Sequence, residues 1–221
     1  MISIVFLLLL VANVNCMIQF NQASSPLHQN NQIKHVINNF SNNVNNNVNI
    51  ASDVILALQN LKPTKVVNSN NNYPFTIHGL WHNNDCSGKS GVGFSLSAID
   101  SLVPIMNQVW MSEDGNNTAF WQHEWEKHGS CTGLTQYNFF SKTLTLFKQL
   151  NLTTVISTVG SQINLNNFVN YLNLHTGCVQ TISCDNTNTV TELYFAYNSN
   201  YTQIINCNIK PNQSCAKVIK V

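Results

Sequence analysis

The sequence contains no arginine and carries very little charge of either sign. All ten basic residues of the 221-residue chain are lysines, nine residues are acidic, and the formal net charge is +1. Without arginine, no site can hold a phosphate or a carboxylate through the two parallel hydrogen bonds of a guanidinium group. The balanced charge also excludes a broad basic surface for long nucleic acid. Any polyanion must therefore be bound locally, by Lys and His.

The chain also lacks an apolar run of membrane-spanning length. An apolar stretch covers Ile2 to Val11, much shorter than the roughly 20 residues that cross a bilayer. Val14 and Cys16 suit cleavage before Met17, so residues 1–16 are predicted to be a secretory signal peptide. The alternative is an uncleaved membrane anchor. After removal of the signal peptide, we expect a secreted or lumenal protein without membrane contact.

Large apolar residues are scarce in the segment that follows. Residues 17–50 are rich in Asn and Gln and contain too few large side chains to build a core. Such a composition is typical of a disordered leader. A pro-segment or a binding arm is the alternative. We expect the folded domain to occupy residues 51–221.

Cysteine is present in an even number once Cys16 leaves with the signal peptide. An even set in a secreted chain fits three disulfides. The six cysteines are Cys86, Cys131, Cys178, Cys184, Cys207 and Cys215. The candidate N-glycosylation acceptors are Asn39, Asn116, Asn151, Asn200 and Asn212. Asn is so abundant in this chain that several such triplets are expected by chance.

The hydrophobic pattern predicts a mixture of helices and short strands. The expected helices cover residues 94–110, 117–128, 137–150 and 165–174. The expected strands cover residues 54–58, 76–80, 179–182, 190–197, 202–205 and 216–221. No internal repeat is present. The economical fold is therefore a single α+β domain with an antiparallel sheet packed against several helices.

The ionisable groups with catalytic potential gather in the segment 120–131, FWQHEWEKHGSC. On a helix that advances about 100° per residue, His123, Glu124, Lys127 and His128 fall within roughly 140° of one another. Such a cluster is uncommon for an ordinary solvated face in a chain with only 9% charged residues. Gly129 is expected just beyond the end of this helix, where Gly is favoured.

A zinc site is the first alternative for this cluster, because His-Glu also begins the metalloprotease motif His-Glu-x-x-His. Here His123 and His128 are five residues apart instead of four. The extra residue rotates the second imidazole by about 100°, and Lys127 would repel a cation. We therefore predict no metal and no other cofactor.

A second segment, 75–81, places His78 among apolar strand-forming residues, followed by Gly79 and Trp81. A single His on an apolar strand is more often a core residue than a catalyst. Together, however, the segments 75–81 and 120–131 resemble the two active-site motifs of the ribonuclease T2 family of secreted and endolysosomal RNases. The motifs stand in the family's order, with matching cysteines, and the resemblance extends over residues 53–221.

The resemblance implies roles for the clustered groups. His78 and His128 form the acid–base pair, with His128 assigned as the base and His78 as the acid, although the two roles are interchangeable. His123 would hold phosphate, while Lys127 and Glu124 would stabilise or polarise the phosphoryl oxygens.

The same resemblance implies contacts to the RNA bases. Trp81 and Phe120 would stack on bases, and Gln59 and Asn83 are further candidates for base contacts. Ordinary packing in the core is the alternative for both aromatic residues. Three positions near these residues depart from the family pattern. Asn60 replaces a Trp, His82 replaces a Pro, and Asn83 replaces an Asp.

For the cysteines, the resemblance implies bridges Cys86–Cys131 and Cys184–Cys215. Ala196 stands where the family has a partner for Cys207, so a shifted bridge Cys178–Cys207 is expected instead.

The implied activity is that of a monomeric endoribonuclease acting on single-stranded RNA and not on DNA. The 2′-OH of RNA can serve as the nucleophile without a metal and leave 2′,3′-cyclic phosphate ends. Opposite protonation of two His is easiest near or below pH about 6.5, which suits a secreted or endolysosomal protein. The alternatives are a catalytically silent T2-like storage or binding protein and a secreted glycan- or protein-binding module.

Overall fold

A computed structural model describes residues 54–61, 73–82, 85–87, 92–157, 159–177, 179, 181–205 and 215–221. The chain divides into two units, Met1–Asn49 and Ile50–Val221, and all described residues belong to the second. Several predicted features lie outside the described residues. They are the signal peptide 1–16, the leader 17–50, Asn39, Asn83, Cys178, Cys207 and Asn212.

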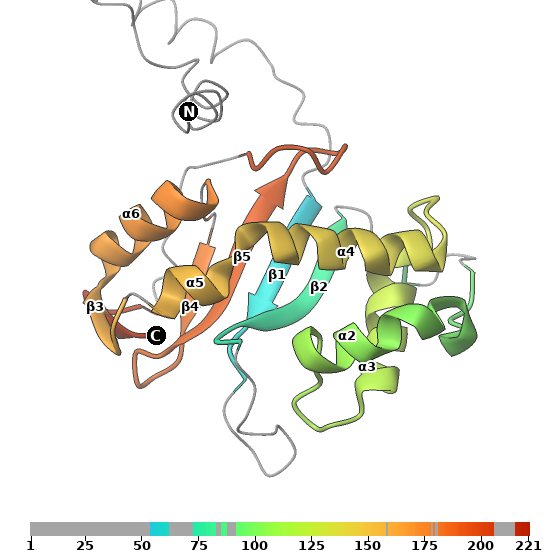
Figure 1. Cartoon of the computed structure of the whole chain (residues 1–221), viewed down its shortest axis with the longest axis horizontal. Helices are drawn as coiled ribbons and strands as arrows, with labels where there is room; N and C mark the ends of the chain where they lie inside the picture. Colours follow the sequence, from blue (N-terminus) through green and yellow to red (C-terminus); the bar gives the residue numbers. More distant parts are fainter. Residues whose placement is uncertain are drawn as a thin grey trace, which may run out of the picture. The chain divides into compact units, whose positions relative to one another are not determined.

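A four-stranded antiparallel sheet forms the centre of the fold (Figure 1). Its strands stand in the order β2-β1-β5-β4. Their bounds are β1 Val54–Gln59, β2 Thr76–His82, β5 Val190–Tyr197 and β4 Thr181–Cys184. Alternate residues of a strand point to opposite faces, and Leu56, Leu58 and Phe195 have no exposed surface. One face of the sheet therefore faces the core.

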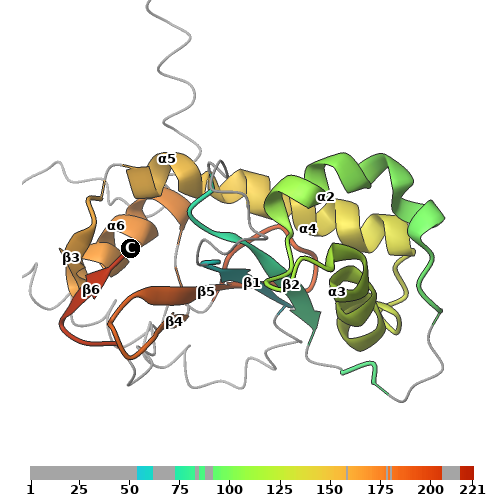
Figure 2. The same ribbon diagram turned by 90° about the horizontal axis from the view of Figure 1, so that it is seen from below.

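The long helix α4, Gln136–Leu150, packs across this sheet, as Figures 1 and 2 both show. Its apolar residues recur at helical spacing, with Phe139, Phe140, Leu146 and Phe147 buried. The Thr135 side chain accepts a hydrogen bond from the Asn138 N–H and so caps the first turn.

The remaining elements surround the sheet. The helical ones are η1 Leu96–Leu102, α2 Val103–Val109, α3 Asn117–Glu124, η2 Trp125–Gly129, α5 Leu152–Ser157 and α6 Leu165–Thr176. A two-stranded sheet joins β3 Gln162–Asn164 to β6 Val218–Lys220. Within the described ranges, no helix combines the length and apolar character that would cross a membrane.

The α+β fold predicted from the sequence is confirmed, and most of its elements lie where they were expected. Two expectations need correction, and two short elements were not predicted. The helix predicted over 94–110 is a 3-10 helix followed by the short α2, with Pro104 in its first turn. Residues 202–205 form only an isolated bridge, between Tyr197 and Ile204. The elements α5 and β3 were not predicted, because both are too short to show a clear period.

Candidate active site

His78 occupies a bulge in β2. Ala57 of β1 pairs with Gly79, whereas the next residue, Leu58, pairs with Ile77, so His78 is the additional residue of β2. A bulge changes the direction in which neighbouring side chains point. Here it brings His78 to the side of the sheet that carries Gly79 and Trp81. The sequence pattern alone would have allowed His78 to point into the core.

Two buried indoles hold the backbone of this bulge. The Trp110 Nε1–H donates to the carbonyl oxygen of His78 at 2.9 Å. The Trp121 Nε1–H donates in turn to the carbonyl oxygen of Trp110 at 2.8 Å. Since both indoles are almost fully buried, these bonds are shielded from water and fix His78 relative to α3.

The side chain of His78 contacts a carboxylate that the sequence did not indicate. Its Nδ1 lies 3.3 Å from Glu192 Oε1 on β5, and both side chains are less than one-third exposed. The Tyr194 hydroxyl donates to the other oxygen of Glu192 at 2.8 Å. The hydrogen bond to His78 is the main reason that the pKa of Glu192 is lowered. No local motif marks Glu192, which lies 114 positions after His78 in the chain.

The second predicted segment folds as a helix that changes its winding. The α3 helix ends at Glu124, and a π-helical turn, η2, continues it from Trp125 to Gly129. A π turn is rare and often marks a functional site. In this turn the Ser130 N–H reaches back to the Trp125 carbonyl at 2.8 Å. The uniform 100° rotation assumed in the sequence analysis therefore fails within this segment.

Gly129 is the last residue of the π turn and not, as predicted, the first residue beyond the helix. It is buried and does not adopt a positive φ. A Cβ at this position would collide with the Trp125 ring and lie 3.1 Å from Phe139 Cδ2. Close packing, not a left-handed cap, is the physical reason for glycine here.

The four ionisable groups of this segment have different environments. His123 is exposed, Lys127 and His128 are partly buried, and Glu124 is only 1% exposed. They therefore do not form one uniform face. The α3 helix, which η2 continues, lies beside β2 (Figure 2), and η2 itself contacts β2, so Lys127 and His128 are brought close to the first motif.

Glu124 points from α3 toward β2. The Trp81 Nε1–H donates to Glu124 Oε2 at 3.1 Å. The absence of a side chain at Gly79 makes this approach possible, because a Cβ there would collide with the same carboxyl oxygen. Burial raises the pKa of Glu124 to about 7, against the opposing effects of the His78 and Lys127 charges and the Trp81 hydrogen bond.

The environment of His128 lowers its pKa, whereas the environment of Glu124 raises the pKa of that carboxyl. Burial, together with the nearby Lys127 charge, lowers the pKa of His128 to about 4. Its Nδ1 is buried and has no hydrogen-bond partner among the described residues. The imidazole is therefore held in its neutral form at mildly acidic pH.

Trp81 lies in contact with both candidate catalytic histidines. Its ring centroid is 5.0 Å from that of His78 and 5.6 Å from that of His128. Tyr194 approaches it at 5.4 Å. Phe120 lies 5.8 Å from His78 and is partly exposed. The structure thus brings four predicted residues from two distant segments together, His78, Trp81, Phe120 and His128.

Gln59 forms hydrogen bonds to the backbone of two other segments. Its side-chain amide N–H groups donate to the carbonyl oxygens of Met111 at 2.9 Å and Ile77 at 3.4 Å. These bonds tie β1 to the segment that follows Trp110. A contact of Gln59 with a base stays a prediction.

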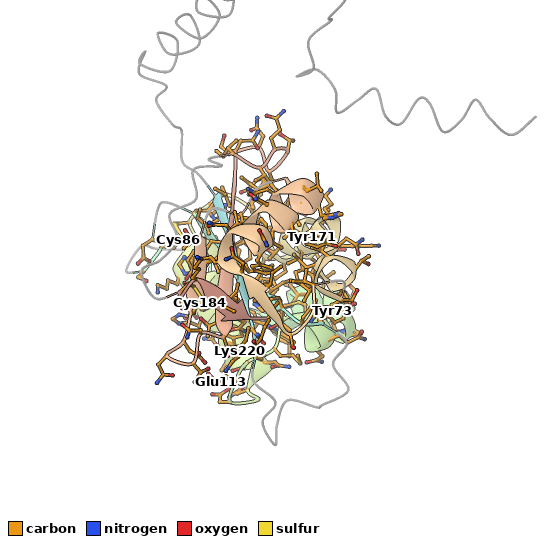
Figure 3. All side chains as sticks on the ribbon, turned by 90° about the vertical axis from the view of Figure 1, so that its left-hand side faces the viewer. Tyr73, Cys86, Glu113, Tyr171, Cys184 and Lys220 are labelled. Carbon is orange, nitrogen blue, oxygen red and sulfur yellow. A yellow bond between two sulfur atoms is a disulfide. The ribbon has the colours of Figure 1, made fainter. Side chains whose placement is uncertain are left out.

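Two disulfides lie within the described residues, and Figure 3 labels one cysteine of each, Cys86 and Cys184. Cys86 joins Cys131, and Cys184 joins Cys215. The Cys86 N–H also donates to the Lys127 carbonyl at 2.8 Å. The chain after β2 is therefore fastened covalently and by hydrogen bonding to the end of η2.

The three candidate glycosylation sites that the structure describes, Asn116, Asn151 and Asn200, are all exposed.

Among the described residues, no group of three or more His, Cys, Asp or Glu side chains is arranged to hold a metal ion.

Comparison with known proteins decides the family. The model of the ribonuclease T2 family matches residues 50–207. This chain belongs to the ribonuclease T2 family. Extracellular ribonuclease LE of Solanum lycopersicum is 29% identical over 168 residues, which cover 66% of this chain and 72% of that protein. Ribonuclease DdI of Dictyostelium discoideum is 30% identical over 163 residues, or 66% and 71% of the two chains.

Human ribonuclease T2 is similar in sequence and in fold. Its sequence is 33% identical over 100 residues, which cover 42% of this chain and 39% of the human protein. Its crystal structure superposes with a TM-score of 0.63 at 23% identity, covering 76% of this chain and 95% of that one. The structure of RNase NT in complex with 5′-AMP gives a TM-score of 0.61 at 22% identity, with 76% and 97% covered. The fold is therefore that of the T2 ribonucleases, and membership of the family supports an endoribonuclease function.

Proposed function

We propose that this protein is an endoribonuclease that cleaves single-stranded RNA by transphosphorylation and leaves 2′,3′-cyclic phosphate ends. One observation carries the proposal. His78 and His128 both contact the Trp81 ring, and the indole N–H of Trp81 donates to buried Glu124. Two imidazoles near one phosphate can remove a proton from one oxygen and supply a proton to another.

His128 is the base in this mechanism. Its neutral imidazole, favoured by burial, takes the proton of the 2′-OH while the 2′ oxygen attacks phosphorus. The O2′–P bond forms and the P–O5′ bond breaks. No external nucleophile is required, because the substrate supplies its own.

His78 is the acid. The Glu192 carboxylate lies within hydrogen-bonding distance of His78 Nδ1. This contact orients the ring and balances the charge of the imidazolium. The Nε2–H is then available to protonate the departing 5′ oxygen. This arrangement supports the assignment of His128 as the base and His78 as the acid.

Lys127, His123 and Glu124 stabilise the phosphorane. Lys127 and His123 offset its negative charge in a chain that has no arginine. Glu124 is protonated below about pH 7, and its OH group can donate a hydrogen bond to a phosphoryl oxygen.

The two shifted pKa values define an acidic working range. His128 must be neutral, which requires a pH above about 4, and Glu124 must be protonated, which requires a pH below about 7. This range supports the expectation from the sequence that the reaction is favoured at mildly acidic pH. It also agrees with a secreted or endolysosomal location, which we propose for this chain by similarity to the extracellular ribonuclease of tomato.

Trp81 and Phe120 remain the candidates for stacking on RNA bases. Solved structures of RNase NT and of RNase MC1 mutants contain 5′-AMP, 5′-GMP or 5′-UMP. These nucleotides support a nucleotide-binding surface in this chain as well.

The purified protein should be incubated with RNA at about pH 5 in excess chelator. We expect cleavage and 2′,3′-cyclic phosphate ends, detected by mass spectrometry of the products. Loss of cleavage in chelator that one divalent ion restores would refute the mechanism. Absence of cleavage under all conditions would favour a silent T2-like binding or storage protein.

A further inference from the structure

His82, the last residue of β2, forms hydrogen bonds through both of its ring nitrogens. Nδ1 lies 3.1 Å from the carbonyl oxygen of His128. Nε2 lies 2.7 Å from the hydroxyl oxygen of Tyr201. The ring thus connects the candidate general base to the segment that follows β5.

The chemistry of the two partners fixes the tautomer of this ring. A carbonyl oxygen can only accept, so the proton of neutral His82 must be on Nδ1. Nε2 then accepts a hydrogen bond from the Tyr201 O–H. Burial lowers the pKa of His82, which favours this neutral form.

The His128 carbonyl needs such a donor because it lies at the end of a helix. The last carbonyls of a helix have no partner within it. Ser130 Oγ donates to the Glu126 carbonyl, Cys86 N–H to that of Lys127, and Thr132 to that of Gly129. His82 supplies the donor for His128 and therefore completes this set.

Tyr201 is presented to His82 by a tightly bonded turn. Its φ of 59° lies in the left-handed region, which is unusual for an aromatic residue. The Tyr201 N–H donates to the Asn198 carbonyl at 2.9 Å, and Asn198 Oδ1 accepts from the Thr202 N–H at 2.9 Å. The Lys142 ammonium lies 5.3 Å from the Tyr201 ring centroid. The neighbouring contacts keep the phenol in place.

The ring of His128 depends strongly on the position of its own backbone. Its Nδ1 has no hydrogen-bond partner within the described part of the chain, so this atom does not anchor the imidazole. A displacement of about 1 Å in a catalytic group can cost roughly 100-fold in rate. A fixed carbonyl at His128 is therefore important for a base that lacks a side-chain anchor at Nδ1.

We propose that His82 is a positioning residue, which together with Tyr201 holds the backbone of His128 so that its imidazole can act as the base. The proposal rests on the proposed function, because it assigns His82 a role through His128. His82 itself does not contact the reacting atoms.

Three variants test this role. His82→Ala removes both bonds, His82→Asn keeps an N–H at the place of Nδ1, and Tyr201→Phe removes only the hydroxyl. We expect His82→Ala to lower kcat on RNA on the order of 10-fold to 100-fold, with little change in KM. His82→Asn should recover most of this loss, and Tyr201→Phe should lie between the wild type and His82→Ala. His175→Ala is the matched control, since this exposed histidine contacts Tyr171 within α6, and it should leave kcat unchanged.

A second readout does not require enzymatic activity. NMR titration of labelled histidines follows His128 directly. We expect its pKa to rise from about 4 toward the ordinary value in His82→Ala, because the ring loses its fixed buried place, and to return toward the wild-type value in His82→Asn.

Unchanged kcat and unchanged His128 titration in His82→Ala would overturn the proposal, as would a His82→Asn variant no better than His82→Ala. If His82→Ala does not fold, Tyr201→Phe and His82→Asn carry the test. A wild-type protein inactive on RNA would instead overturn the proposed function, while the titration would still report on positioning.

Discussion

The Trp81 indole N–H donates to Oε2 of Glu124 at 3.1 Å, and this bond joins the two motifs of the site directly. Trp81 comes from β2 and Glu124 from α3. The carboxyl is almost completely buried, and the open space at Gly79 lets it approach the strand. The tryptophan is therefore a structural partner of the Glu124 carboxyl as well as a candidate surface for a base.

The titration of Glu124 should make the folded protein less stable as the pH rises. Its folded pKa of about 7 lies above the ordinary 4.5, so the folded state binds the proton more tightly. The associated stability is present below pH 4.5 and is lost as the pH rises through 7, by up to about 3 kcal/mol. Glu124→Gln lacks this titration. The free energy of unfolding in urea should therefore increase for Glu124→Gln relative to wild type between about pH 4.5 and 7.

Glu126→Gln is the control for this measurement, because Glu126 is exposed on the same segment. Its difference from wild type serves as the baseline for replacing an exposed carboxylate in this segment. His128 has the opposite sign, since its lowered pKa contributes stability that is present above its ordinary value and is lost as the pH falls toward 4. A Glu124→Gln difference that is constant with pH would contradict the buried, protonated carboxyl.

Both histidines should be essential for RNA cleavage. Removing a group that transfers a proton in the transition state commonly lowers the rate on the order of 100- to 10,000-fold. His78→Phe and His128→Phe should each show such a loss in kcat. Lys127→Ala should be intermediate, because Lys127 stabilises charge but transfers no proton. Circular dichroism establishes that the variants are folded, and near-normal rates in either His variant would exclude its assigned role.

Glu192 should support catalysis through His78. Glu192→Ala removes the carboxylate that lies 3.3 Å from His78 Nδ1, and we expect kcat to fall on the order of 10-fold. Glu192→Gln keeps an acceptor oxygen but loses the charge, so its kcat should lie between those of wild type and Glu192→Ala. The exposed Glu113 provides the control variant Glu113→Gln. Equal kcat values for Glu192→Ala and wild type would show that His78 does not depend on this contact.

The two described disulfides should affect function differently. Cys86–Cys131 closes a separation of 45 residues beside Lys127 and His128, so its replacement by Ser at both positions should lower stability on the order of 2–4 kcal/mol. It should also lower kcat, because the end of η2 becomes less restrained. The double Ser variant of Cys184 and Cys215 should lose stability but keep its kcat. Unfolding curves and steady-state kinetics separate the two effects, and equal kcat losses in both variants would contradict the local role of Cys86–Cys131.

Local patterns in the sequence were sufficient for most of the fold. The apolar runs that begin at Val54 and Thr76 are strands, and the amphipathic pattern before Leu150 is a helix. The two motifs also identified the residues that meet at Trp81. These features depend on neighbours in the chain, which periodicity reports directly.

The features that the sequence did not predict depend on distant contacts. The bulge at His78 arises from its register with Ala57 and Leu58 of another strand. The π turn cannot be recognised from a regular 100° rotation, and this is why the expected position of Gly129 was wrong. Glu192 reaches His78 only because β5 and β2 flank β1 in the sheet.

The role of the 2′-OH is tested most directly by comparing two strands of identical sequence, one of which carries a single 2′-deoxy sugar at a chosen cleavage position. Initial rates of cleavage at that position are measured at about pH 5 in excess chelator. The mechanism predicts rapid cleavage of the all-RNA strand with a 2′,3′-cyclic phosphate end, and no cleavage at the deoxy position, because the nucleophile is absent there. Comparable rates at that position in both strands would contradict the mechanism.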